Sequence, residues 1–163
     1  MDLNTDAASR PVAARTARHA VAIRIARWLL PPYLVVVGLI VFLPAPEAGR
    51  ITGIVGWAAD VLASFGAPRE PSAIALEFLA NIALFVPFGV LVALAFPTVR
   101  WWKVILAGAL TSIGIEAVQL ALPTRFPTVS DVVANTIGTA VGLCLTLWWS
   151  RVRRPLDSDR SPT

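Results

Sequence analysis

Glu116 stands inside the apolar run from Trp101 to Leu122, and its chemistry is the hardest in the chain to attribute to packing. A charged side chain at membrane depth costs about 2.5–3.5 kcal/mol on insertion scales. Helical spacing places Ser112 four residues before Glu116 and Gln119 three residues after it, on the same face. A carboxylate in such an apolar site can act as a general acid or base, or bind a polar group.

Two further apolar segments carry polar residues at helical spacing. One contains Glu77 and Asn81, and the other contains Asp131, Asn135, Gly138 and Gly142. Arg125 lies shortly before the second of these, and its planar guanidinium would suit a phosphate. We therefore predict two catalytic carboxylates, Glu116 and Asp131. The predicted substrate-binding residues are Asn81, Ser112, Gln119, Arg125 and Asn135.

Each of these residues also has a purely structural interpretation, which the sequence leaves open. Asp131 can be a helix cap, since an anion is favourable at a helix N-terminus. Asn81 and Asn135 can be hydrogen-bonding links between helices. Glu116 can pair with Arg125 for structure alone. The glycines at 138 and 142 fit close helix packing.

The composition predicts an integral membrane protein. Of the 163 residues, 56% are hydrophobic, and the mean hydropathy is +0.71, which is far above that of a soluble domain. The single cysteine, Cys144, excludes an intramolecular disulfide, and with one histidine no zinc cluster is expected. We predict no metal and no cofactor, although Glu116 and Asp131 with amide oxygens could suit a hard cation.

Four apolar segments are each near the length needed to cross a bilayer. They are Ile25–Leu43, Ile74–Phe96, Trp101–Leu122 and Val132–Trp149. Residues 51–66 are apolar but shorter, and we interpret them as an interfacial helix with Trp57 at headgroup level. The predicted fold is an all-α membrane bundle of four transmembrane helices with a short amphipathic helix on the outer face. A cleaved signal peptide is an alternative for the first segment, which Pro31-Pro32 argues against.

Charge predicts the orientation of the bundle. Eleven of the fourteen lysines and arginines fall in three clusters, and the alternate loops hold Arg50, Arg69 and Arg125 alone. The positive-inside rule then predicts a multi-pass plasma-membrane protein with both termini cytoplasmic. The basic residues flank apolar segments, so lipid rather than nucleic acid is the expected partner. We divide the chain into a disordered basic N-terminus (1–24), a transmembrane domain (25–149) and a cytoplasmic tail (150–163).

The same residues carry a resemblance to the VanZ-like family. The run Asn81 to Gly89 resembles its N-x-x-x-F-x-P-x-G element, and Ser112 to Gln119 is similar to its S-x-x-x-E-x-x-Q element. Arg125 followed by Asp131 to Gly142 resembles the element R…D-x-x-x-N-x-x-G-x-x-x-G. The resemblance covers about Ile74 to Leu147 and implies a small bacterial membrane protein. The name-giving member is associated with low-level teicoplanin resistance, and the family's biochemical activity is not established.

Three classes of function remain in competition. An enzyme could act on an extracytoplasmic lipid headgroup or a lipid-linked cell-wall precursor, with Glu116 as general acid or base. A binding protein could shield such a headgroup from a lipoglycopeptide with the same residues and no turnover. A small transporter or assembly partner could couple Glu116 to proton flow. Transport has the least support, because the inner half of the bundle carries no matching polar group and four helices would require an oligomer.

Overall fold

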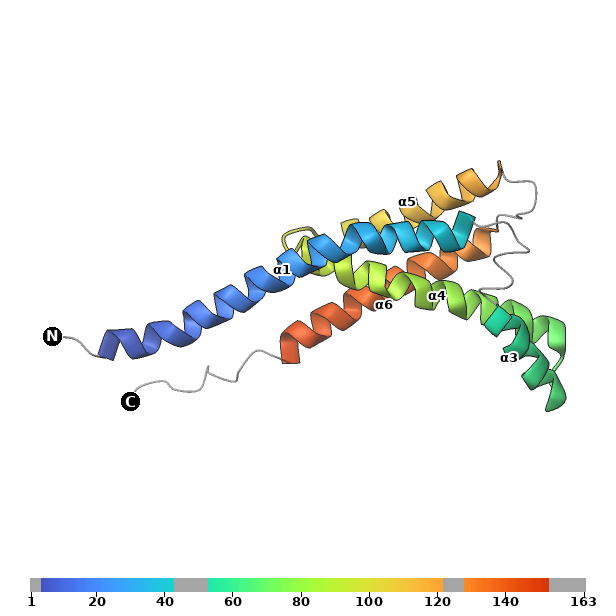
Figure 1. Cartoon of the computed structure of the whole chain (residues 1–163), viewed down its shortest axis with the longest axis horizontal. Coiled ribbons are helices and arrows are strands. Elements are labelled where there is room, and N and C mark those ends of the chain that lie inside the picture. The colour runs from blue at the N-terminus through green and yellow to red at the C-terminus, as the bar shows by residue number, and fades with distance from the viewer. Residues whose placement is uncertain (1–3, 43–52, 122–127, 153–163) are drawn as a thin grey trace.

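The structure, a computed structural model, describes residues 4–42, 53–121 and 128–152, and the regular structure in these ranges is all helical (Figure 1). The helices are α1 (Asn4–Phe42), α3 (Gly53–Ser64), α4 (Arg69–Ala95), α5 (Trp101–Gln119) and α6 (Val129–Val152). Four are long and apolar enough to cross a membrane: His19–Ile40 within α1, and the whole of α4, α5 and α6. The predicted all-α bundle with four candidate spans and one shorter helix is confirmed.

The first helix departs most from expectation. α1 begins at Asn4, within residues 1–24, which we expected to be disordered. The Ala- and Arg-rich composition explains the difference, because both residues favour helix. The helix also continues through Pro31-Pro32 without a break. Prolines are tolerated in membrane helices, where neighbouring groups can satisfy the backbone positions that they free.

The other helix ends differ by five residues or fewer from the predicted ones. α4 begins before Ile74, after Pro68, which has an extended backbone conformation, and Glu70 lies in its first turn, where an acidic side chain is favourable. α5 ends at Gln119 rather than at Leu122. α6 begins at Val129 rather than at Val132, and it continues past Trp149 to Val152.

α4 and α6 form the centre of the bundle, and glycines set how closely they approach. A Cβ added at Gly138 would lie 2.3 Å from the carbonyl oxygen of Ile82, and one at Gly142 would lie 2.1 Å from that of Val86. A Cβ at Gly89 of α4 would lie 2.2 Å from the carbonyl oxygen of α6 Thr139. No side chain fits at these positions without a backbone shift, so the packing role predicted for Gly138 and Gly142 is confirmed.

Two side chains of α1 attach it to α4. The Tyr33 hydroxyl donates a hydrogen bond to the carbonyl oxygen of Leu84, in the turn where Pro87 removes one backbone donor. Arg27 Nε donates to the carbonyl oxygen of Ala95 at 3.0 Å, where α4 ends. The Arg27 guanidinium also lies 5.6 Å from the centre of the Phe96 ring. A cation at a helix C-terminus satisfies free carbonyls and interacts favourably with the helix dipole.

α3 leaves the bundle at an angle and packs on the beginning of α4 (Figure 1). The turn between them requires Gly66, whose φ of +91° is in the left-handed region. Across this turn Arg69 Nε donates to Asp60 Oδ1 at 2.5 Å, in an exposed ion pair. Trp57 is exposed on α3, as expected for a residue at headgroup level.

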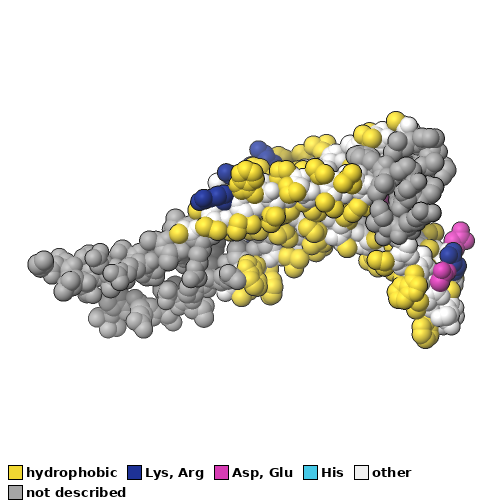
Figure 2. All heavy atoms as spheres, viewed as in Figure 1, with side chains coloured by type: hydrophobic (Ala, Val, Ile, Leu, Met, Phe, Trp, Pro, Cys, Tyr) yellow, Lys and Arg dark blue, Asp and Glu magenta, His cyan; other side chains and the backbone are white. Residues whose placement is uncertain are grey.

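The two ends of the bundle differ in chemistry. We name them the α3 end, where α4 and α6 begin, and the α4–α5 end, where α4 passes into α5. Hydrophobic side chains cover the middle of the face drawn in Figure 2, whereas charged side chains lie toward its two ends. The apolar core lies along the inside of the helices and includes buried residues from α1, α4, α5 and α6: Val37, Phe85, Phe88, Val92, Val104 and Leu143.

Candidate functional site

Polar side chains from α4, α5 and α6 meet at the α3 end of the bundle. We name as the polar cluster six residues that hydrogen bonds connect in pairs: Asn81, Ser112, Glu116, Thr128, Asp131 and Asn135. On α5 the buried residues form the single stripe predicted from the sequence, and Gly108, Ser112, Glu116 and Gln119 all belong to it. Helical periodicity thus positions one side of the cluster.

Glu116 joins the end of α5 to the beginning of α6. Its side chain is buried, with 9% of the residue exposed. The backbone N–H of Thr128, the residue just before α6, donates to Glu116 Oε2 at 3.0 Å. This hydrogen bond holds the carboxyl group against the beginning of α6.

The cap of α6 is Thr128 rather than Asp131, which the sequence offered as a possible cap. Thr128 Oγ1 accepts a hydrogen bond from the backbone N–H of Asp131 at 3.3 Å, which is the usual geometry of an N-cap. In a capping box the acidic residue three positions later would accept the N–H of the cap residue. Here Glu116 from α5 accepts that N–H instead, which leaves the Asp131 carboxylate available to another helix.

Asp131 uses its carboxylate to contact α4. Asn81 Nδ2 donates to Asp131 Oδ1 at 2.7 Å, so the bond links the two central helices. The carboxylate also lies near enough to Glu116 for the two to interact electrostatically. The two carboxylates that the sequence singled out are therefore brought together, each held by one neutral donor.

One turn further into the bundle, Asn135 contacts α5. Its Nδ2 donates to Ser112 Oγ at 2.8 Å, and the two residues are 5% and 0% exposed. Its Oδ1 is buried and has no hydrogen-bond partner in the structure. The Thr139 hydroxyl donates to the backbone carbonyl of Asn135 at 2.9 Å. An unsatisfied buried acceptor costs about 1–3 kcal/mol, so the amide oxygen of Asn135 is a feature that needs an explanation.

The sequence analysis also named Gln119, Glu77 and Arg125. Gln119 is buried at the end of the α5 stripe. Glu77, one turn before Asn81, is exposed. Arg125 lies outside the described residues. In the described ranges no group of three His, Cys, Asp or Glu side chains is placed to hold a metal ion.

Sequence reasoning assigned no role to Thr128 or Thr139, although both support the cluster. The pattern Thr128-Val-Ser-Asp131 is the sequence signature of a helix N-terminus and would have identified the cap. Thr139 has no comparable local signal. Its contact with α5, where a Cβ on Gly108 would lie 2.2 Å from Thr139 Oγ1, depends on how the helices pack.

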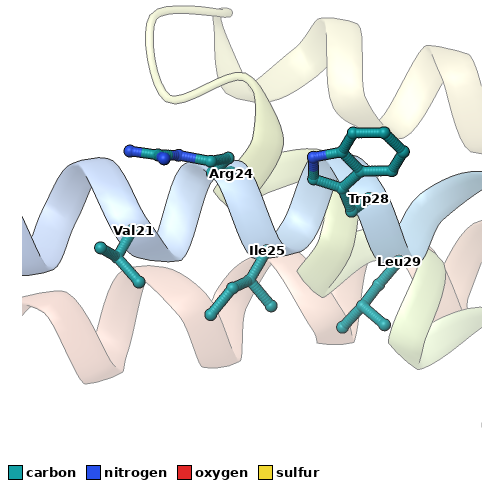
Figure 3. A pocket seen from close by; sticks show the side chains of 5 residues that line it. All are labelled: Val21, Arg24, Ile25, Trp28 and Leu29. Atoms are coloured by element: carbon teal, nitrogen blue, oxygen red, sulfur yellow. The ribbon is translucent and has the colours of Figure 1, made fainter.

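A groove on the surface of α1 is separate from the polar cluster. It measures about 260 Å³ and is lined by Val21, Arg24, Ile25, Trp28 and Leu29 (Figure 3). Two ridges of one helix form it, with Val21, Ile25 and Leu29 on one side and Arg24 and Trp28 on the other. Arg27 in the same stretch contacts the end of α4, so the groove lies toward the α4–α5 end. It contributes nothing to the chemistry of the polar cluster.

The comparisons with known proteins agree with this architecture. A family model described as VanZ/LLP1 matches residues 32–150, which is more than half of the chain. The matched range includes α4, α5, most of α6 and every residue of the polar cluster. No curated protein and no solved structure gave a match. With four helices long enough to cross a bilayer and this match over most of its length, the chain is a multi-pass membrane protein that belongs to the VanZ/LLP1 family.

Proposed function

We propose that the polar cluster binds the headgroup of a membrane lipid or of a lipid-linked cell-wall precursor at the outer face of the plasma membrane. Binding there would change the susceptibility of the cell to a lipoglycopeptide such as teicoplanin. The observation that carries the proposal is the placement of Glu116. It is a buried carboxylate in a membrane span, and a backbone N–H of the neighbouring helix fixes its position.

The electrostatics of the site support a binding role. Burying a carboxylate in an apolar environment is costly unless another group compensates its charge. Among the described residues neither Glu116 nor Asp131 forms an ion pair, since the ion pair found there joins Asp60 to Arg69. Each carboxylate is held by a neutral donor that leaves its charge in place. A bound polar group could supply the missing compensation.

In this proposal the residues have distinct roles. Glu116 and Asp131 contact the headgroup, and they would serve as acid and base if the headgroup is also transformed. Asn81 and Asn135 position it through the network to Asp131 and Ser112. The remaining predicted binding residues, Gln119 and Arg125, would complete the site, with Arg125 directed to a phosphate.

The orientation is part of the proposal. If both termini are cytoplasmic, the α3 end with the polar cluster faces outward. The short apolar helix α3, with exposed Trp57 and an exposed ion pair at its turn into α4, suits the outer membrane–water interface. Extracytoplasmic headgroups would then reach the cluster without crossing the bilayer.

A structural role is the second candidate, and the hydrogen bonds themselves favour it. Asn81 to Asp131 links α4 to α6, and Asn135 to Ser112 links α6 to α5. Such bonds stabilise membrane helix pairs by about 0.6 kcal/mol on average. In that case the cluster holds the helices together and binds no ligand.

A susceptibility assay separates the two candidates. Wild type, Glu116→Gln, Arg125→Ala and Glu77→Gln would be expressed to equal membrane levels in a host lacking the gene. Glu77→Gln is the matched control, because it neutralises an exposed carboxylate that lies outside the cluster. We expect wild type and Glu77→Gln to protect against teicoplanin, and Glu116→Gln and Arg125→Ala not to protect. Equal protection by all four proteins would leave the structural role.

A second measurement separates binding from turnover. Purified protein would be incubated with labelled lipid-linked precursors, followed by analysis of both retained and converted lipid. If the site only binds, Glu116→Gln should retain part of the precursor, because an amide still forms hydrogen bonds. Conversion by wild type but not by Glu116→Gln would instead identify Glu116 as a catalytic residue.

A further inference from the structure

The described side chains of the polar cluster present an excess of hydrogen-bond acceptors. A carboxylate can accept about four hydrogen bonds. The structure shows the Thr128 backbone N–H donating to Glu116 and the Asn81 amide donating to Asp131, and each carboxylate can accept more hydrogen bonds than these. The two donors are an amide group and a backbone N–H, which bring no positive charge.

Asn135 adds a third hydrogen-bond acceptor to the cluster. Its Oδ1 accepts no hydrogen bond from the described residues, and only 5% of the residue is exposed, so the atom is also shielded from water. Asn135 lies one turn from Asp131 on α6, and its amide bonds to Ser112, one turn from Glu116 on α5. Asn135 is therefore one helical turn deeper in the bundle than the two carboxylate-bearing residues. A buried acceptor of this kind is normally satisfied by protein, water or ligand.

We propose that the group bound between Glu116, Asp131 and Asn135 is a primary ammonium. This inference rests on the proposed function and names the chemistry of the headgroup that the site takes. An ammonium carries three N–H donors in a compact positive charge and has no acceptor. It can therefore donate to all three acceptors while compensating the two carboxylates. An uncharged hydroxyl offers one donor and leaves the charge in place.

Amine-bearing headgroups come from two sources, membrane phospholipid and the peptide part of a cell-wall precursor. A series of phospholipids with increasing N-methylation tests whether the site binds an ammonium, which both sources carry. Full-length protein in mixed micelles would be offered phosphatidylethanolamine and its mono-, di- and trimethylated forms with identical acyl chains. Native mass spectrometry would measure how much of each lipid is retained. The phosphate is the same throughout, so the series varies the number of N–H donors.

The proposal predicts that retention falls with each added methyl group. The unmethylated lipid should exceed the trimethylated one by about tenfold, because the loss of charged hydrogen bonds is of that order. A precursor with a free amine, compared with the same precursor after N-acetylation, tests the second source. A loss of retention on N-acetylation, with equal retention of all four phospholipids, would assign the site to the precursor. Equal retention in both comparisons would overturn the proposal.

Matched variants connect the preference to the three acceptors. Glu116→Gln should remove the preference for the unmethylated lipid, and Glu77→Gln should leave it intact. Asn135→Asp keeps an acceptor oxygen and should preserve the preference, whereas Asn135→Leu should reduce it. The wild-type series decides the question even where a variant fails to fold. An unchanged preference in both Glu116→Gln and Asn135→Leu would place the ammonium elsewhere and overturn the proposal.

Arg125 belongs to the chain itself, and its guanidinium could occupy the proposed site in place of an ammonium ligand. If Arg125→Ala shows the methylation preference and wild type does not, the arginine occupies the site and the ammonium proposal is wrong. A different result distinguishes failure of the ammonium proposal from failure of the proposed headgroup binding. Headgroup retention that depends on Glu116 without any methylation preference would leave headgroup binding in place and remove the ammonium alone.

Discussion

At the scale of single residues, the exchange of partners around Thr128 determines the geometry of the site. Asp131 could have closed a local capping box with the Thr128 backbone. Glu116 accepts that N–H instead, and Asp131 turns to Asn81. Because Glu116 rather than Asp131 accepts the Thr128 N–H, a carboxylate from α5 lies beside a carboxylate from α6. Neither would hold this position through local interactions alone.

The capping role of Thr128 can be tested by its effect on the stability of the protein. Thr128→Ala removes the hydroxyl that accepts the Asp131 N–H and leaves the N–H that donates to Glu116. We expect a loss of about 1 kcal/mol in the free energy of unfolding, as for other N-cap residues. Unfolding in detergent by denaturant titration measures this difference. Thr128→Ser keeps the hydroxyl and should remain near wild type, and a similar loss in both variants would contradict the capping role.

The bond between Ser112 and Asn135 can be isolated with a double-mutant cycle. Ser112→Ala, Asn135→Ala and the double variant would be compared by the same unfolding measurement. We expect a coupling energy of about 0.6 kcal/mol and no more than about 1.7 kcal/mol, the range found for side-chain bonds between membrane helices. A coupling near zero would mean that the 2.8 Å contact contributes no net stability.

The sequence predicted some of these residues because their signal is local. The α5 stripe follows from helical period, so Ser112, Glu116 and Gln119 could be assigned to one buried face. The partner of Asp131 could not be predicted in the same way, since Asn81 is 50 positions away. Which of two possible acids accepts the Thr128 N–H is likewise decided by helix packing.

At the scale of helices, α4 and α6 carry a related pattern. Glu77-x-x-Ala-Asn81 and Asp131-x-x-Ala-Asn135 both begin near the α3 end, and glycines follow within the next turns. The glycines bring the two backbones together and thereby place Asn81 within reach of Asp131. Small residues commonly allow such close approach in membrane helices, where van der Waals packing drives association.

The glycine contacts predict opposite effects for one substitution at two positions. Gly142→Ala places a Cβ against the Val86 carbonyl and should destabilise the protein by about 1–3 kcal/mol. Gly114→Ala on α5 meets nothing within 4 Å, and it should stabilise by about 0.5–1 kcal/mol because Ala restricts the unfolded backbone. Thermal unfolding of the two variants checks the signs. A stabilising Gly142→Ala would be inconsistent with the close approach of α4 and α6.

The attachment of α1 to α4 has its own test. Tyr33→Phe removes the hydroxyl that donates to the Leu84 carbonyl and keeps the ring. The loss of one hydrogen bond should lower the free energy of unfolding by about 0.5–1.5 kcal/mol. Denaturant unfolding would measure it, with Trp57→Phe on the exposed face of α3 as a control expected to change little. No loss in Tyr33→Phe would show that α1 is held by apolar packing alone.

At the scale of the whole molecule, the two ends of the bundle carry different charged and polar side chains. Arg27, Arg100 and Lys103 lie toward the α4–α5 end, whereas the polar cluster and the Arg69–Asp60 ion pair lie at the α3 end. Composition and hydropathy were sufficient to predict the four spans, because these depend on length and apolarity. The helical N-terminal part of α1 was not predicted, because the polarity of the segment indicated disorder although its Ala and Arg residues favour helix.

This division of charge predicts which end faces outward. Basic residues are retained on the cytoplasmic side of bacterial membranes, so the α3 end should be extracytoplasmic. In a Cys144→Ser background, which removes the single native cysteine, new cysteines would be introduced at exposed Ser64 on α3 or exposed Thr98 between α4 and α5. A membrane-impermeant maleimide applied to intact cells should label Ser64→Cys, and label Thr98→Cys only after lysis. The reverse pattern would place the polar cluster in the cytoplasmic half of the bilayer. An extracytoplasmic headgroup could then not be its ligand, whatever the affinity of the purified protein.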